Sequence, residues 1–97
     1  MKTYNVYILK CADESYYTSI TGELEKRLEE HHAGKRKSTQ YRRPVKLVFN
    51  AEFSKISMAV HSELEIKQWT RTQKEALIKR GKQATPSLLQ RQLVLEM

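Results

Sequence analysis

Two short runs rich in tyrosine and β-branched residues constrain the fold more than any other feature of the chain. Residues 4–9 read Tyr-Asn-Val-Tyr-Ile-Leu, a run too short for a helix and too apolar for a half-exposed strand. After a polar break at residues 12–15, the run at 16–20 is again typical of a strand. The two runs therefore predict a β-hairpin whose first strand is central in its sheet.

The register of this hairpin decides where its tyrosine side chains lie. If the loop has an odd number of residues, period-2 alternation places four side chains on one face of the sheet: Tyr7, Leu9, Tyr17 and Ser19. Two phenols then converge on that face. In the alternative interpretation Tyr7 and Tyr17 are ordinary strand residues, as most tyrosines in strands are.

A helix is predicted after the hairpin, up to about residue 32, because Leu24 and Leu28 form an apolar stripe. Arg27 and His31 are four residues apart, so they lie on the same face of this helix, one turn from each other. Taken alone, this spacing is typical of a solvated face.

The rest of the chain completes a single α+β domain. The same signals predict a strand at 45–49 and helices at 57–69, 72–81 and 87–95. A chain of 97 residues with 39% hydrophobic residues has room for one small core. We therefore expect a folded domain over residues 1–82 and a C-terminal helical tail over 83–97 that packs on it or extends it.

Glu63 is unusual in the helix predicted at 57–69. At 100° per residue it projects about 60° from Val60 and about 40° from Ala59, which places its carboxylate within the apolar arc. A charge at such a position needs a partner. Three interpretations follow: a tilted helix that lets Glu63 reach water, an ion pair with Lys67 one turn further on, and a metal ligand.

The charge distribution favours a nucleic-acid partner. Eighteen Lys and Arg against eleven Asp and Glu give a formal net charge of +7. A run without acidic residues extends around Tyr41 to Lys46. The candidate nucleic-acid-binding residues in it are Lys35, Arg36, Lys37, Tyr41, Arg42 and Arg43. Acidic residues concentrate just before this run. We expect a phosphate-facing loop at residues 35–46.

Several classes of protein are disfavoured by what the sequence does not contain. One cysteine, Cys11, allows no internal disulfide and, with its apolar neighbours, indicates a small buried residue in a reducing compartment. No signal peptide and no membrane-spanning run is recognisable, so a cytoplasmic protein is expected. Glycine-rich phosphate loops and a zinc-type ligand set are also absent from the sequence, so nucleotide cofactors and structural zinc are not expected.

The chain resembles the GIY-YIG nuclease superfamily in an ordered set of residues: Asn5-Val6-Tyr7, Tyr17-Thr18-Ser19, Arg27, His31 and Glu63. The resemblance covers residues 4 to about 80 and is particularly close to a branch of small stand-alone bacterial proteins. Those proteins run like Val-Tyr-Ile-Leu-Lys-Cys at 6–11 and Glu-Ile-Lys-Gln-Trp at 65–69. It implies a small three-stranded antiparallel sheet flanked by helices and a metal-dependent endonuclease acting on DNA.

The resemblance also implies roles for individual residues. Glu63 matches the metal-binding glutamate, and a lone carboxylate suits one hydrated Mg²⁺ or Mn²⁺ ion. Arg27 matches the catalytic arginine, whose planar fork suits a scissile phosphate. Tyr7 and Tyr17 match the signature tyrosines, one of which helps to activate water, and His31 matches a position that relays a proton.

Ser19 departs from the family pattern, because glycine usually stands at this position and allows a close backbone approach. The departure leaves two further interpretations beside the endonuclease. One is a non-catalytic nucleic-acid-binding module that keeps the basic loop. The other is an interaction module that docks through an apolar tail around Leu88 and Leu95.

The basic loop leads to a quantitative prediction for DNA binding. If four of its cations contact phosphates, the logarithm of the binding constant for duplex DNA should fall with the logarithm of salt concentration at a slope of about −3.6. Fluorescence anisotropy at several salt concentrations measures this slope. A slope near zero would contradict a phosphate-facing loop.

Overall fold

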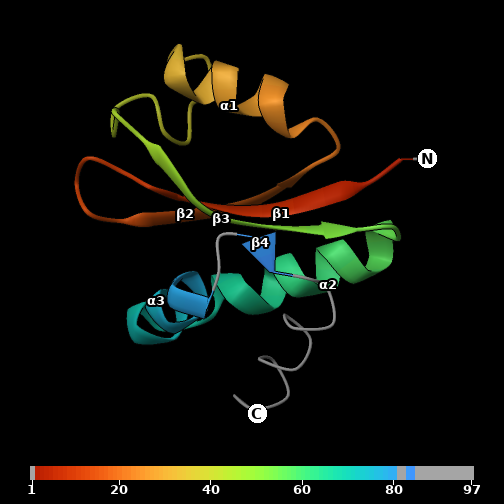
Figure 1. Cartoon of the computed structure of the whole chain (residues 1–97). Helices are drawn as coiled ribbons and strands as arrows, with labels where there is room; N and C mark the ends of the chain where they lie inside the picture. The colour runs from red at the N-terminus through yellow and green to blue at the C-terminus, as the bar shows by residue number, and fades with distance from the viewer. Residues whose placement is uncertain (1, 81–82, 85–97) are drawn as a thin grey trace.

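The fold is a twisted sheet with helices on both faces (Figure 1). The computed structural model describes residues 2–80 and 83–84. The elements follow in chain order: β1 (Tyr4–Lys10), β2 (Tyr16–Thr21), α1 (Leu24–His32), β3 (Lys46–Phe53), α2 (Ile56–Lys67), α3 (Arg71–Arg80) and β4 (Gln83–Ala84). The predicted α+β class is confirmed. The tail helix expected at 87–95 lies outside the described residues.

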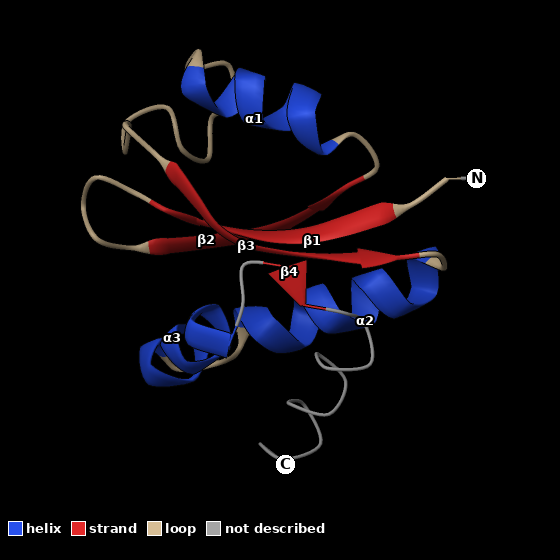
Figure 2. Ribbon diagram, viewed as in Figure 1, coloured by secondary structure: helices blue, strands red, loops and turns tan. Residues whose placement is uncertain are grey.

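The sheet has the strand order β2-β1-β3-β4. β1 is antiparallel to both β2 and β3, which confirms the three-stranded antiparallel sheet and the central position of β1 (Figure 2). The two-residue strand β4 pairs parallel to β3, with Gln83 opposite Asn50. This strand was not predicted, because two residues are too few to show the alternation that identifies a strand.

The hairpin has the odd-numbered loop that places both phenols on one face. Lys10 pairs with Tyr16, which leaves residues 11–15 in the loop. As a result Tyr7 pairs with Ser19 and Leu9 with Tyr17, so these four side chains share one face of the sheet.

Alternate residues of β1 supply two thin apolar layers. On one face, Val6 and Ile8 pack with residues of β3, α2 and α3 in the larger cluster, which is centred on Phe49. On the other face, Tyr7 and Leu9 pack under α1, together with Cys11. Figure 1 shows α1 on one side of the sheet and α2 and α3 on the other. Cys11 is buried, as its apolar neighbours predicted.

The buried face of α2 differs from the one predicted. Val60 marks the apolar arc that was predicted for this helix, but it is 38% exposed, and the apolar Leu64 is 52% exposed. Ser62 and Glu63 are buried in their place, beside Ala59. The helix is therefore rotated so that polar side chains meet the sheet. No helix in the described ranges 2–80 and 83–84 has the length and apolar character of a membrane span.

Phe49 should dominate the stability of the larger layer, because its side chain is completely buried in the central part of β3. We expect Phe49→Ala to lower the free energy of unfolding by about 3 to 5 kcal/mol through lost transfer energy and a residual cavity. Urea denaturation measures the change. Lys46→Ala, at an exposed position of the same strand, is the control and should shift stability by less than about 0.5 kcal/mol. Equal effects of the two substitutions would contradict this packing.

Candidate active site

Three aromatic side chains from three elements meet between the sheet and α1. Tyr7 comes from β1, Tyr17 from β2 and His31 from the last turn of α1. Their ring centroids are 6.5 Å apart for the two tyrosines, 5.8 Å for Tyr7 and His31, and 5.4 Å for Tyr17 and His31. All three pairs are edge-to-face contacts, a geometry that fixes the orientation of each ring. Tyr7 and His31 are fully buried, whereas Tyr17 is half-buried.

A chain of hydrogen bonds runs through His31. The Tyr7 hydroxyl lies 2.9 Å from His31 Nε2, and His31 Nδ1 lies 2.7 Å from the hydroxyl oxygen of Thr39. Thr39 is also fully buried, so the loop after α1 folds back onto the histidine. Sequence reasoning missed Thr39, because a single threonine among basic residues gives no signal of this long-range contact. Two proton arrangements satisfy the chain, with the His31 ring proton on either nitrogen.

Burial and nearby cations keep His31 neutral. Burial is the main cause that lowers the pKa of His31 to about 4, and the guanidinium groups of Arg36 and Arg27 lower it further. At neutral pH the ring therefore carries one proton. One of its nitrogens donates a hydrogen bond and the other accepts one, which matches a chain with a hydroxyl at each end.

The Tyr7 phenol is protonated at neutral pH in this environment. Burial raises the pKa of Tyr7 above its ordinary value of 10.0, and the neighbouring Tyr17 adds to this increase. The Ser19 hydroxyl and the Arg27 guanidinium lie close enough to oppose it, with Ser19 as the stronger of the two. Arg27 is therefore close enough to Tyr7 to lower its pKa, but burial has the larger effect.

Arg27 belongs to a charged network on the surface beside this cluster. Its Nε atom is 3.6 Å from Glu30 Oε1, and Arg36 Nη1 is also 3.6 Å from that oxygen. These side chains line a small polar hollow of about 170 Å³, together with Thr21, Glu23 and Lys26. Glu30 was assigned no role from sequence, and here it links two arginines. An anion that replaced the Glu30 carboxylate in these contacts would lie between two guanidinium groups.

Glu63 lies on the other side of the sheet. It is on α2, which packs against the face opposite α1 (Figure 2). Glu63 is 8% exposed, so its predicted place in the buried arc is confirmed. Its Oε2 atom is 3.3 Å from Lys67 Nζ, the ion pair that the spacing of four residues indicated. The structure therefore joins Tyr7, Tyr17, His31 and Arg27 but connects Glu63 to Lys67.

A metal ion at Glu63 would take most of its ligands from water. Within the described residues, no group of three His, Cys, Asp or Glu side chains could hold an ion. A single carboxylate is nevertheless sufficient for Mg²⁺ or Mn²⁺, which keep most of their water ligands. Thr18 lies on the α2-facing side of β2, and its buried hydroxyl oxygen has no hydrogen-bond partner in the described chain. An unsatisfied polar atom in this layer is suited to ordered water.

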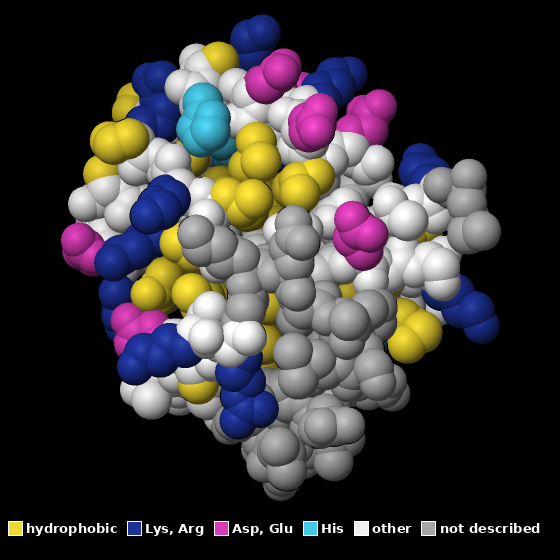
Figure 3. Space-filling model, viewed as in Figure 1, with side chains coloured by type: hydrophobic (Ala, Val, Ile, Leu, Met, Phe, Trp, Pro, Cys, Tyr) yellow, Lys and Arg dark blue, Asp and Glu magenta, His cyan; other side chains and the backbone are white. Residues whose placement is uncertain are grey.

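The basic side chains of the loop at residues 35–46 include two arginines with hydrogen bonds to the protein and two lysines exposed to solvent. Arg42 donates to the Ser15 hydroxyl oxygen at 2.8 Å and to the Ser38 carbonyl at 2.8 Å. Arg43 donates to the carbonyls of Gln40 and His32 at 3.1 and 3.3 Å. These two arginines hold the loop, whereas the side chains of Lys35 and Lys37 are exposed. Figure 3 shows acidic side chains gathered over α1 and Lys and Arg side chains along the left margin of the face drawn.

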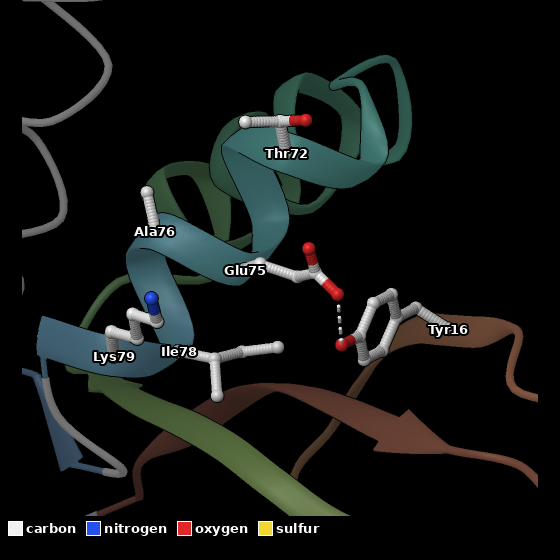
Figure 4. A pocket seen from close by; sticks show the side chains of 6 residues that line it. All are labelled: Tyr16, Thr72, Glu75, Ala76, Ile78 and Lys79. Carbon is white, nitrogen blue, oxygen red and sulfur yellow. Dashed lines mark hydrogen bonds between the residues drawn. The ribbon is translucent and has the colours of Figure 1, made fainter.

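A larger hollow lies beside α3 (Figure 4). Figure 1 shows α3 on the side of the sheet opposite α1. The volume of the hollow is about 490 Å³, and none of the predicted site residues lines it. The Tyr16 hydroxyl donates to Glu75 Oε2 at 3.1 Å, and the Arg71 guanidinium lies 4.6 Å from the centre of the Tyr16 ring. These contacts attach α3 to β2, so we interpret the side chains as structural.

The buried histidine leads to a prediction about stability and pH. The folded-state pKa of His31 is about 4, below the unfolded value of 6.5, so between these pH values the unfolded chain binds more protons. The stabilising contribution is therefore complete above pH 6.5 and is lost as pH falls towards 4. We expect His31→Gln to reduce the loss of stability between pH 7 and pH 4.5, measured by urea denaturation. Parallel pH profiles of the two proteins would contradict a neutral buried imidazole.

Comparisons with known proteins agree with this architecture. The family model for the GIY-YIG catalytic domain matches residues 3–76. A UPF0213 protein of Staphylococcus haemolyticus is 47% identical over 79 residues, which cover 80% of this chain and 96% of the relative. A UPF0213 protein of Syntrophus aciditrophicus is 45% identical over 78 residues, which cover 78% of this chain and 90% of the relative.

Two solved structures are similar in fold and sequence. The solution structure of a UPF0213 protein from Bacillus halodurans is 36% identical with a TM-score of 0.57, and a protein from E. faecalis is 38% identical with a TM-score of 0.61. Each comparison covers 82% of this chain and 86% of the other. On sequence and fold together, the chain belongs to the GIY-YIG family of nuclease domains, among the small proteins of the UPF0213 group.

Proposed function

We propose that the chain is a divalent-metal-dependent endonuclease that hydrolyses phosphodiester bonds in DNA. The observation that carries the proposal is the cluster of Tyr7, Tyr17 and His31. Arg27 lies close enough to this cluster to lower the pKa of the Tyr7 hydroxyl. Phosphodiester hydrolysis requires a cation for the phosphate and a group that moves a proton at the attacking water. Arg27 supplies the cation at the rim, and the buried Tyr7 and His31 with the half-buried Tyr17 supply the proton-moving groups.

Arg27 and Arg36 form the proposed phosphate site. Both face Glu30 Oε1 at 3.6 Å, a distance longer than that of a good charge-assisted hydrogen bond. A phosphate oxygen would therefore gain shorter contacts than this carboxylate provides. Arginine is suited to the task because its fork can donate two parallel bonds to one phosphate.

Phosphate binding would also change the proton affinity of His31. Arg36 and Arg27 are the two charged neighbours that lower the pKa of His31 most. An anion bound to them offsets their positive charge, so the pKa of His31 rises when substrate is bound. Tyr7 then has an acceptor for its proton at His31 Nε2, 2.9 Å away. In this scheme Tyr7 passes its proton to His31, and the phenolate accepts a proton from the attacking water, which requires that bound substrate exposes the Tyr7 hydroxyl.

Glu63 would hold the metal ion, as one carboxylate ligand among waters and phosphate oxygens. When bound, the ion would offset negative charge on the leaving oxygen. Glu63 must then exchange its ion pair with Lys67 for the cation. β2 is the outer strand of the sheet, and it lies between the α1 layer and the α2 layer. We propose that DNA binds along the outer edge of β2, where it meets both layers.

A non-catalytic nucleic-acid-binding module is the second candidate. The observation that favours it is the ion pair between Glu63 and Lys67, which occupies the proposed metal ligand. In this case Lys35 and Lys37 would still contact phosphates. The two functions make different predictions for DNA cutting.

The proposed chemistry predicts that cutting depends on both Glu63 and Arg27. We expect Glu63→Gln to abolish nicking of plasmid and branched DNA, with wild-type activity present in Mg²⁺ and lost with a chelator. Arg27→Lys should lower the rate by about 100-fold, because lysine cannot replace the planar fork. The measurement is a single-turnover cleavage assay on gels.

The control is Glu65→Gln, which removes the same charge from the same helix, two residues away. Its cutting rate should stay within about twofold of wild type. Salt-sensitive binding without any cutting in wild type would select the binding module. Cutting that persists in Glu63→Gln would exclude Glu63 as the metal ligand.

A further inference from the structure

Tyr41 is presented to solvent far more than an aromatic side chain normally is. It is 91% exposed, the highest value among the large hydrophobic side chains that are exposed in the described chain. Residues 2–80 and 83–84 provide it with no hydrogen bond, ring contact or cation–π partner. Both faces of the ring are therefore free to stack on a planar group such as a nucleobase.

The loop around Tyr41 is fixed on both sides. Two residues earlier, the buried Thr39 contacts His31 at 2.7 Å, and its amide donates to the Arg36 carbonyl. On the other side, the Arg42 amide donates to the Thr39 carbonyl at 2.9 Å, and the Arg42 carbonyl accepts from the Ala12 amide at 2.9 Å. The ring therefore projects from an anchored turn, and binding would cost little ordering of the backbone.

The surroundings of Tyr41 are suited to a nucleic-acid strand. The loop from Lys35 to Lys46 contains no acidic residue, and the side chains of Lys35 and Lys37 are exposed. Proteins that bind single strands combine such cations for the backbone with aromatic rings on which bases stack. The chemistry thus favours a base with a free face.

We propose that Tyr41 is a stacking platform for an unpaired nucleobase. This proposal rests on the proposed function, because it specifies single-stranded or branched DNA as the substrate class of that site. Thr39 touches the catalytic cluster, and two residues of backbone span at most about 7 Å. The stacked base therefore belongs to a nucleotide near the scissile phosphate. Bases inside a duplex are stacked on both faces, so fully paired DNA would gain nothing from this ring.

The test compares binding of single-stranded and blunt duplex oligonucleotides by fluorescence anisotropy, in a buffer with a chelator. We expect Tyr41→Ala to weaken binding of a single-stranded oligonucleotide by about 5- to 150-fold, and Tyr41→Phe to keep it within about twofold. Duplex binding should change by less than about twofold in both variants. Gln40→Ala, at the adjacent position, is the matched control and should behave as wild type. A 2-aminopurine base in the strand should be quenched by wild type and by Tyr41→Phe only.

Two results would overturn the platform. One is unchanged single-strand binding in Tyr41→Ala, and the other is an equal loss on single-stranded and duplex DNA, which would indicate a general effect on the loop. Either result leaves the nuclease intact if wild type cuts DNA with metal. Conversely, a Tyr41-dependent preference for single strands without any cutting supports the platform and removes the proposed enzyme. If the wild-type protein bound neither single-stranded nor duplex DNA, a nucleobase would be excluded as the ligand of Tyr41, and a protein partner would be indicated.

Discussion

The burial of β1 on both faces is the constraint on which the rest of the structure depends. Every residue from Asn5 to Leu9 is buried, because β2 and β3 flank this strand and helices cover both of its faces. Its alternation sends Val6 and Ile8 into the larger core and Tyr7 into the candidate site. The Tyr7 phenol is therefore positioned by the most buried element of the fold. A domain this small has no separate scaffold for its site, so one strand serves both core and chemistry.

The electrostatics of the site also follow from the small size of the domain. A fully buried imidazole is normally expensive to protonate, and here two arginines at the rim strengthen that effect. Those arginines are also the groups that a phosphate would bind. In the proposed function, phosphate binding to these arginines would therefore raise the proton affinity of His31 through charge. Thr39 contributes by keeping the second nitrogen of His31 paired, so that the ring presents Nε2 to Tyr7.

Local patterns predicted the parts of the structure that depend on local sequence. Period-2 alternation predicted the hairpin and, for an odd-numbered loop, the shared face of Tyr7 and Tyr17. Helical spacing offered the Glu63–Lys67 pair as one of its interpretations. The features that were not predicted depend on long-range contacts or are too short to show a sequence pattern. The contact of Thr39 with His31 depends on how a loop folds back, and β4 is too brief to have a period. The rotation of α2 was not predicted either, because packing against the sheet decides that Ser62 is buried and Leu64 is exposed.

Ser19 shows how a departure from the family pattern is consistent with the same chemistry. It lies directly opposite Tyr7 in the antiparallel ladder, so its hydroxyl and the phenol share one face of the sheet. Among the neighbours of Tyr7, the Ser19 hydroxyl opposes the effect of burial on the phenol pKa most strongly. A glycine at this position would leave the phenolate without that donor. The serine removes the open space of glycine, and in the proposed mechanism its hydroxyl would favour the phenolate form of Tyr7.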